Sequence, residues 1–404
     1  MKNCTNGFKN NIKSMGREID SIITYSMNGV TNQLGVEELN AVTPSFEGGL
    51  LKSVMKQLVI DSNVSLPIET ELNYSFGVKV NGEYEYLDFG NYIVYSSEKK
   101  EDTNSYEIKC YDKMLYSMKN YEMSVQYPIS IRDFISSICT TIGVVFANEE
   151  DEFANYDKMI NEDMFSNQNY TYRDVLDQLA QVTASCICIN NDNELEIRYF
   201  NETNETIDEE SLKDVNVNFG EVFGPINTIV LSRSADSDNI YYPSTLPESP
   251  LEYKIVDNII MNYNDRDTYL PDIYEKLNGL TFAINDFASI GICYLELLDK
   301  YDIVIGDNTY NCLMLNDEIL VTQGLEENIY TEKIEETNTQ YEYANSTDRT
   351  INKAYVIAKK HEGEIELLTS RTNTMQDALN NTYTKEQTNR LISDAATGVT
   401  NNYT

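Results

Sequence analysis

The residue types that most often perform catalysis are scarce in this sequence. His361 is the only histidine among 404 residues, so a Ser-His-Asp or Cys-His arrangement would have to include it. It lies at a core position of a predicted coiled coil, where a packed histidine is the commoner interpretation. No HExxH, Walker or GxGxxG sequence is present. We therefore predict no catalytic residues.

Acidic clusters offer a second route to chemistry, because two carboxylates can hydrolyse a glycosidic bond. Residues 149–152 read Glu-Glu-Asp-Glu, and residues 265–267 read Asp-Arg-Asp. With 66 acidic residues in the chain such pairs are inevitable, and none lies in a recognisable motif. Residues 192–194 are better interpreted as a hairpin tip than as a calcium loop, because the other ligands and the central glycine of an EF-hand are missing. We predict neither a metal nor a cofactor.

The seven cysteines do not form a disulfide or zinc pattern. They lie at positions 4, 110, 139, 186, 188, 293 and 312. Their odd number and the lack of CxxC spacing disfavour both kinds of site. We expect buried free thiols in a protein that folds in a reducing cytosol.

Net charge and composition restrict the possible functions. The chain has 30 basic and 66 acidic residues and a net charge of −36, which disfavours simple DNA binding. An acidic surface suits a protein that DNA must pass without adhering, although a solvated exterior or an acidic proteome explains the charge equally well. The hydrophobic content of 41%, with 30 tyrosines and no tryptophan, suits folded, β-rich domains.

No targeting or membrane segment is predicted. The first 11 residues are polar and contain no apolar signal region. No apolar run approaches the roughly 20 residues that span a bilayer. We expect the protein to be soluble when it is made.

The elements begin with a β-rich region over residues 1–115. Short apolar runs alternate there with turns, and the best hairpin signal is Asn81-Gly82. A second hairpin is predicted between residues 92–95 and 106–110. Residues 116–205 read as a small α+β domain, in which Ser130 and Thr171 each precede an Arg-Asp pair and a helical apolar pattern. Helix capping explains these Arg-Asp pairs more simply than ligand binding does.

The second half is again rich in strands. Residues 201–214 are acidic and threonine-rich, which predicts a linker. Strands are expected at residues 215–219 and 227–232, divided by a turn at Gly224-Pro225, and at 251–261, 282–284, 290–297, 302–305, 308–315 and 318–323, with a short helix or turn at 271–277.

A heptad pattern follows over residues 351–379 and predicts a parallel coiled coil. The seam contains few large apolar side chains, so the helix is not expected to drive assembly alone. It would continue a symmetry axis that the upstream domains already fix. A single amphipathic helix packed on its own domain is the alternative. The predicted seam residues are Ile351, Ala354, Ala358, His361, Ile365, Leu368, Thr372, Met375 and Leu379.

The order of these parts resembles a known family. Residues 90–94 read Gly-Asn-Tyr-Ile-Val, residues 106–114 read Tyr-Glu-Ile-Lys-Cys-Tyr-Asp-Lys-Met, and residues 127–134 read Tyr-Pro-Ile-Ser-Ile-Arg-Asp-Phe. This succession is similar to the tail-tip hub proteins of phages that infect Gram-positive bacteria, also called tail-associated or prophage endopeptidase-tail proteins. The family is similar in fold to the baseplate hub of contractile-tailed phages.

The resemblance implies a mainly β, α+β fold in five parts. A first β tube domain would comprise residues 1–115, and a second residues 206–245 with 296–345. Peripheral α+β domains would comprise residues 116–205 and the insertion 246–295. Residues 346–404 would form the coiled-coil stalk and a polar tail.

The resemblance also implies a function and partners. Three chains would form a ring at the tail tip or baseplate, assembled in the bacterial cytoplasm, that joins a sixfold tail tube to threefold distal parts. Its partners would be the tube ring above, the C-terminus of the tape measure protein, and receptor-binding or fibre proteins, with DNA only in transit. Where relatives continue into a peptidase or lysozyme-like domain, this chain stops. Two alternatives stay open, namely a cell-wall-degrading tail enzyme and a host-binding adhesin on a coiled-coil stalk.

Overall fold

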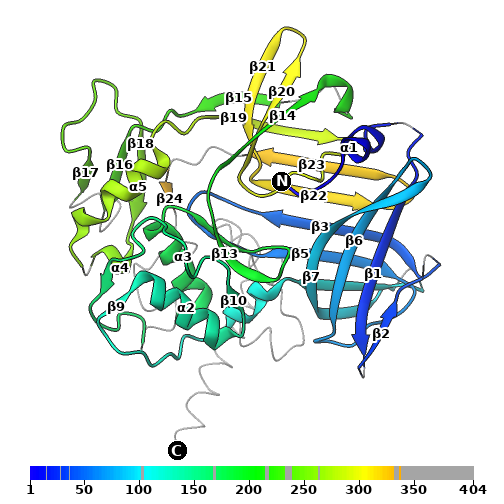
Figure 1. Ribbon diagram of the computed structural model, residues 1–404, viewed down its shortest axis with the longest axis horizontal. Helices are drawn as coiled ribbons and strands as arrows, with labels where there is room; N and C mark the ends of the chain where they lie inside the picture. The colour runs from blue at the N-terminus through cyan, green and yellow to red at the C-terminus, as the bar shows by residue number, and fades with distance from the viewer. Residues whose placement is uncertain are drawn as a thin grey trace, which may run out of the picture. The chain divides into compact units, whose positions relative to one another are not determined.

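An antiparallel sheet of 11 strands is the main element of the computed structural model (Figure 1). The structure describes residues 1–331 and 336–337, apart from residues 15, 28, 36, 102–103, 167–169, 214–217, 233–238 and 263. The strand order is β15-β19-β23-β22-β3-β5-β8-β7-β6-β1-β2. The strands are β1 (Ile19–Met27), β2 (Val30–Gln33), β3 (Leu39–Glu47), β5 (Lys56–Ser62), β6 (Glu71–Val80), β7 (Glu83–Lys99), β8 (Tyr106–Tyr111), β15 (Asn218–Phe223), β19 (Phe282–Ser289), β22 (Asn316–Val321) and β23 (Leu325–Thr331).

The two β-rich regions of the sequence share this sheet through one strand pair. β3 and β22 run antiparallel, with Phe46 opposite Asp317 and Ser45 opposite Glu318. Directly after β3, the Gly48 N–H donates to the Leu315 carbonyl at 2.9 Å and to Asn316 Oδ1 at 3.0 Å. Segments about 270 residues apart in the chain are therefore adjacent strands.

The first half of the sheet follows the alternation and turn chemistry of its sequence. β6 and β7 form the hairpin predicted at Asn81-Gly82, and both turn residues have positive φ, 52° and 94°. This is the conformation that favours Asn-Gly in two-residue hairpins. The second predicted hairpin is also confirmed, because the later part of β7 pairs with β8.

The hydrophobic core lies on the inner face of this sheet. Phe8 and Ile12 of the short helix α1 (Asn6–Ile12) are buried in it. A three-stranded sheet packs into the same core with Ile207, Tyr301 and Cys312. Its strands are β14 (Asn201–Asp208), β20 (Asp299–Ile305) and β21 (Asn308–Leu313).

Three sequence expectations are wrong in this region. Residues 290–297 are predicted as a strand, but they form the connection between β19 and β20, and their apolar side chains fill the core. The segment predicted as a linker, 201–214, contains β14, which pairs with β20, followed by η2 (Glu209–Ser211). Its alternating polar residues form an edge strand rather than a free chain. The N-terminal segment was interpreted only as polar, yet it forms α1, where the Thr5 side chain caps the helix and the apolar residues Phe8 and Ile12 face the core.

The α/β region centres on a sheet in the order β10-β13-β12-β4. Its strand β4 comes from the first β-rich region, since Ser53 lies opposite Ile187 and Val54 opposite Cys188. Two helices pack beside it (Figure 1). The elements are β4 (Ser53–Val54), η1 (Lys113–Met118), β9 (Ile129–Ser130), α2 (Ile131–Ile142), β10 (Val145–Phe146), β11 (Met159–Ile160), α3 (Tyr172–Val182), β12 (Cys186–Ile189) and β13 (Glu194–Arg198).

Helix α3 is buried on all sides, although its sequence predicts only one apolar face. Its polar side chains are paired inside the protein. Asp177 Oδ1 accepts from the Ser53 N–H at 2.7 Å and from the Ser53 hydroxyl at 2.6 Å. On another side, Gln178 Oε1 accepts from the Ile259 N–H at 2.8 Å. These bonds satisfy groups that would be costly to bury unpaired.

The remaining described elements form a second small sheet and its helices. The sheet order is β17-β16-β18-β24. The predicted strand 251–261 is wrong in its second part, which is α4. The elements are β16 (Thr228–Ser232), β17 (Ile240–Tyr242), β18 (Glu252–Val256), α4 (Ile259–Asn262), η3 (Arg266–Thr268), α5 (Leu270–Leu277) and β24 (Glu336–Thr337).

The fold class is therefore α+β and mainly β, as predicted. Residues 1–164 and 171–337 form one compact unit. β19 belongs to the large sheet although it falls within the predicted insertion 246–295, and the five-part division of the chain stays a prediction. The predicted stalk, 346–404, lies outside the described residues. Within the described part, no helix is long and apolar enough to cross a membrane.

The junction between the halves generates the first prediction. A Cβ on Gly48 would lie 2.5 Å from the Leu315 carbonyl oxygen and 2.6 Å from a Leu297 methyl. We expect Gly48→Ala to lower the free energy of unfolding by about 1–3 kcal/mol, measured by urea denaturation. Gly49→Ala is the control, since the nearest atom there is 3.2 Å away on the flexible Lys52 side chain. Equal effects of both variants would contradict the tight junction.

Candidate functional site

The predicted seam residues, from Ile351 to Leu379, lie outside the described residues, and so does His361. The coiled coil stays a prediction. Of the other candidates, the Arg-Asp pairs are helix caps as expected. Thr171 and Asp174 form a reciprocal capping box at α3, and the Ser130 hydroxyl accepts from the Asp133 N–H at 3.0 Å at α2.

The two arginines of these pairs have different surroundings. Arg132 lies over the Tyr156 ring, 4.4 Å from its centroid. Arg173 is buried beside β4 and donates to the Ser53 carbonyl at 3.4 Å. Both contacts stabilise the local fold, and sequence spacing alone did not distinguish them.

The other sequence candidates are separate in space. Residues 192–194 lie at the β12–β13 turn, as predicted, with Asn193 in a left-handed conformation. Among the described residues, no group of His, Cys, Asp and Glu side chains is arranged to hold a metal ion. All seven cysteines are free, and six of them are buried.

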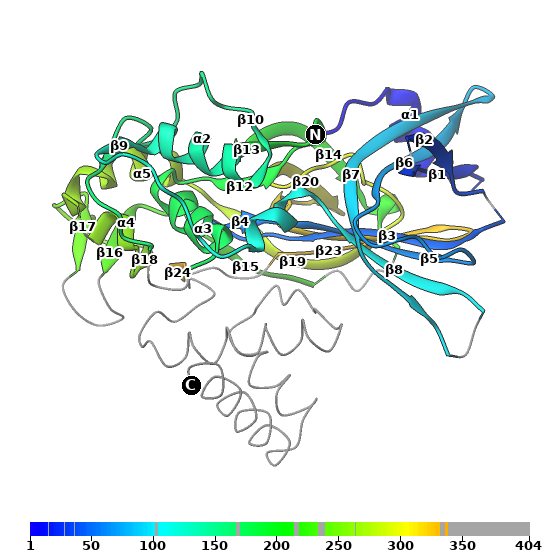
Figure 2. The same cartoon turned by 90° about the horizontal axis from the view of Figure 1, so that it is seen from below.

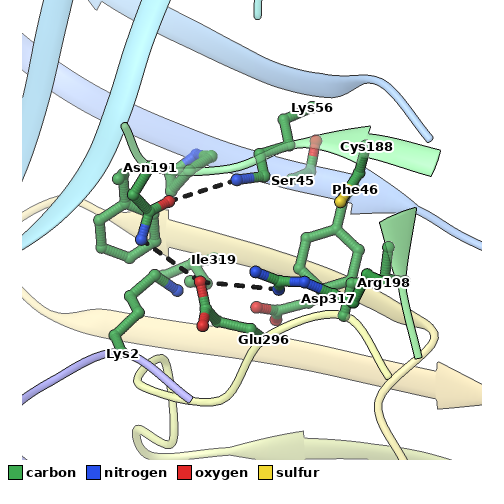
Figure 3. Close-up of a pocket in the computed structure, with 13 residues that line it drawn as sticks. Lys2, Ser45, Phe46, Lys56, Cys188, Asn191, Arg198, Glu296, Asp317 and Ile319 are labelled. Carbon is green, nitrogen blue, oxygen red and sulfur yellow. Dashed lines mark hydrogen bonds and ion pairs between the residues drawn. The ribbon is translucent and has the colours of Figure 1, made fainter. Parts of the chain in front are cut away.

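A small, partly open cavity lies where the N-terminus, both halves of the large sheet and the α/β region meet (Figure 3). Its volume is about 30 Å³, enough for a water molecule. Charged side chains from five segments line it: Lys2, Lys56 of β5, Arg198 of β13, Glu296 and Asp317 of β22.

Glu296 is the centre of a network of charges around this cavity. Its carboxylate lies 3.8 Å from Arg198 and 3.1 Å from the α-amino group of Met1. Asn191 Nδ2 donates to Glu296 Oε1 at 3.3 Å, and Lys56 Nζ donates to Asn191 Oδ1 at 3.3 Å (Figure 3). Arg198 is also 2.8 Å from Glu196 on its own strand. The Glu296 carboxylate thus contacts three segments that are far from it in the sequence, namely the N-terminus, the β12–β13 turn and β13.

These contacts change the protonation of the acids. Burial alone would raise the pKa of Glu296, but the charges of Arg198, Lys2, the Met1 amino group and Lys56 outweigh it and lower the pKa to about 2. Asp317, on the opposite wall, has fewer cations near it. Burial raises the pKa of its carboxyl to about 7, against the opposing charge of Lys2.

The cavity lacks the properties of a catalytic site. Burial raises the pKa of the Cys188 thiol to about 11, although Arg198 opposes the shift, so the thiolate nucleophile is suppressed. Lys2 is engaged, since its Nζ donates to the Cys293 carbonyl at 2.9 Å. The arrangement fits a structural junction. Sequence reasoning missed it, because its residues have no common motif or spacing.

A second feature is the outer face of the large sheet, opposite the core. In Figure 2, α1 lies on the other side of β3, β5, β19 and β23, and α3 and α4 lie beside the large sheet. Strand alternation and register place acidic side chains on this outer face, from β8 through β5, β3, β22 and β23 to β19. These residues are Glu47, Asp61, Glu107, Asp286, Glu318 and Glu326.

Lysines neutralise only half of these acids. Asp61 pairs with Lys100, Glu326 with Lys213, and Glu107 with Lys109 at 3.5 Å. Within the described part, Glu47, Asp286 and Glu318 form no ion pair, and all three are exposed. The outer face is therefore negative and shared by both halves of the chain. We define it as the acidic face.

Comparison with known proteins gives structural similarity only. No protein-family model matches the sequence, and no curated protein matches it. The chain is similar to the 43 kDa tail protein of prophage MuSo2 from Shewanella oneidensis, with 11% identity, a TM-score of 0.46, and coverage of 78% of this chain and 97% of that one.

Two further solved structures are similar. A tail protein from Neisseria meningitidis MC58 has 8% identity and a TM-score of 0.48, with coverage of 78% of this chain and 98% of that one. A prophage tail protein from Listeria monocytogenes EGD-e has 11% identity and a TM-score of 0.46, with coverage of 84% and 99%. Phage tail proteins are thus what this chain resembles in structure.

The charged junction generates a prediction of pH dependence. Because the pKa of Glu296 is lower in the folded protein, its contribution to stability is complete above pH 4.5 and is lost as the pH falls towards 2. Glu296→Gln should lower the free energy of unfolding by about 3 kcal/mol at pH 7. The difference from wild type should close between pH 4.5 and 2, as measured by chemical denaturation.

Glu318→Gln is the matched control, since Glu318 is exposed and has no ion pair in the described part. It should change stability by less than about 0.5 kcal/mol. If Glu296→Gln caused the same loss at pH 2 as at pH 7, its effect would come from packing and not from charge.

Proposed function

We propose that this chain is a non-enzymatic structural protein of a phage or phage-derived tail tip. Three copies form a hub ring that adapts a sixfold tail tube to threefold distal parts. The ring closes the end of the tube and opens for DNA passage. Its partners are the tube ring above, the tape measure protein, and receptor-binding or fibre proteins, and it assembles in the host cytoplasm.

The acidic face is the observation that carries this proposal. DNA is bound through its phosphates by basic side chains, and this face presents Glu47, Asp286 and Glu318 without a neutralising cation in the described part. A channel wall of this kind repels the DNA backbone. DNA can then pass along it without being retained.

The shared sheet supports the threefold arrangement. Each chain contributes two β-rich regions joined by β3 and β22. Three copies therefore supply six such regions, the number that a sixfold tube requires, while the closed ring needs only one kind of heterologous interface. The predicted seam from Ile351 to Leu379 would continue the threefold axis.

The oligomeric state tests the proposal. We expect the purified full chain to have three times the 46.2 kDa chain mass, measured by native mass spectrometry and light scattering. A chain that ends before Arg349 should also be a trimer, because the β-rich regions are proposed to form the main interface. If the truncated chain is a monomer while the full chain is a trimer, the stalk and not the sheet holds the ring together.

The acidic face predicts how DNA binding responds to charge. The combined substitution Glu47→Lys, Asp286→Lys and Glu318→Lys should raise the affinity for double-stranded DNA by about tenfold or more at low salt. The logarithm of the affinity should then fall with the logarithm of salt concentration by about 0.9 for each new phosphate contact. Fluorescence anisotropy on labelled DNA measures both quantities.

The matched control changes the same charge elsewhere. Glu150, Glu162 and Asp267 are exposed and lie outside the acidic face. Their combined substitution by lysine should raise DNA affinity much less, because these charges do not gather on one shared face. An equal gain in both variants would contradict the assignment of the acidic face to the channel.

A further inference from the structure

Two acidic side chains lie inside the hydrophobic core, on adjacent strands of the large sheet. Asp317 of β22 is 3% exposed and Glu327 of β23 is 0% exposed. Glu327 lies opposite Ile319 across the β22–β23 pair, and Asp317 is two residues before Ile319, so both carboxyl groups are on the inner face. Within the described part, Asp317 Oδ1 and Glu327 Oε1 have no hydrogen-bond partner. The core therefore holds two neighbouring carboxyl groups that are incompletely satisfied.

Neither carboxyl group forms an ion pair with a described residue, although two cations lie nearby. Lys2 is near both groups, and Arg17 is near Glu327. Both cations are bound to the backbone instead. Lys2 Nζ donates to two carbonyls of the segment 290–297, and the Arg17 guanidinium donates to three carbonyls. Because two unpaired carboxylates in one core would repel each other, the pair retains at least one proton at neutral pH.

The other side chains beside Glu327 are neutral. The Tyr294 and Tyr301 rings and the Cys293 thiol are buried there, and burial raises the pKa of each. The hydroxyl groups of both tyrosines also have no hydrogen-bond partner in the described part. These groups supply no positive charge that would stabilise an ionised Glu327.

Asp317 faces the partly open cavity, where the cations are engaged with another acid (Figure 3). The charges of Arg198 and Lys56 stabilise the ionised form of Glu296. For Asp317, the charge of Lys2 opposes the effect of burial, and Glu318 on the outer face of the same strand adds to it. Asp317 therefore favours its protonated form although it borders a charged network.

We propose that Asp317 and Glu327 form a proton-dependent latch on the junction between the two halves of the sheet. The junction stays closed while the pair keeps its protons. When the groups release their protons to water, unpaired carboxylates form in the core, and local separation of β22 from β3 exposes them to solvent. Asp317 lies opposite Phe46 of β3 and lines the cavity, so opening begins at this strand pair. The inference does not rest on the proposed role in a tail.

Burial determines the direction of the pH dependence. It raises the pKa of both groups, that of Asp317 to about 7, from ordinary values of 3.8 and 4.5 that return when the groups meet water. Opening therefore releases protons and becomes more favourable as the pH rises. The contribution of Asp317 begins above pH 3.8 and is complete at about pH 7. That of Glu327 continues to higher pH.

Hydrogen exchange on the full chain tests the latch. Exchange rates of the β22 and β3 amides, divided by the intrinsic rates at each pH, give the constant for local opening. We expect this constant to rise about tenfold per pH unit for each proton released, from about pH 5 to 7. β6 belongs to the same sheet but pairs with neither strand, so its amides should change much less. An equal rise in β6 would indicate global unfolding and would overturn the local latch.

Neutral side chains of the same shape test the assignment to these two residues. Asp317→Asn and Glu327→Gln should each reduce the rise by about tenfold per pH unit, because each removes one titrating group. Glu318→Gln is the matched control, since Glu318 is exposed on the same strand, and it should keep the wild-type dependence. A pH-independent opening constant in wild type, or the same reduction in Glu318→Gln, would overturn the inference.

Infrared spectroscopy of the wild-type chain gives a readout that does not depend on a variant. A protonated carboxyl group has a C=O stretching band that an ionised carboxylate lacks. Asp112 and Asp174 are also buried, with pKa values raised to about 6, so the spectrum is recorded at about pH 7, where both are largely ionised. We expect the band to be present there and to disappear over the pH range in which the β22 amides lose protection. Absence of the band, or its persistence after protection is lost, would overturn the latch.

Discussion

The pairing of β3 with β22 is the constraint on which the rest of the structure depends. It makes one sheet out of strands from residues 19–111 and 218–331. The chain between residues 111 and 218 must therefore leave the sheet and return to it. The α/β region therefore forms beside the junction, and its own sheet includes β4 from the first half. Non-local pairing of this kind costs loop-closure entropy, which the large shared core of buried side chains offsets.

The charged network explains how the parts keep one arrangement. Glu296 contacts the Met1 amino group, Asn191 and Arg198. These directional contacts fix the relative positions of three segments, which non-directional apolar contacts do not specify. Buried charges are costly unless each has a partner, and displacement of any one segment would leave the others unpaired. The network therefore selects a single geometry at the point where the halves and the α/β region meet. A defined geometry is what the proposed ring subunit requires.

The sequence predicted local features well and long-range ones poorly. The Asn81-Gly82 hairpin, the caps at Ser130 and Thr171, and the β12–β13 turn follow from turn and capping chemistry, which acts over a few residues. The β3–β22 pair and the Glu296 network could not be predicted, because their residues are far apart and have no motif. Helix α3 shows that the burial of polar residues is also hard to predict from sequence. Its polar residues resemble a solvated face, but they are buried and paired with Ser53, Asn258 and Ile259.

The central claim is that the acidic face of the shared sheet lines a channel in a threefold ring. An electron cryo-microscopy reconstruction of the purified assembly tests it most directly. The account predicts three copies around an axis, with Glu47, Asp286 and Glu318 facing the lumen. A ring in which these residues face outwards or lie within the contacts between copies would contradict it, as would an assembly without a channel.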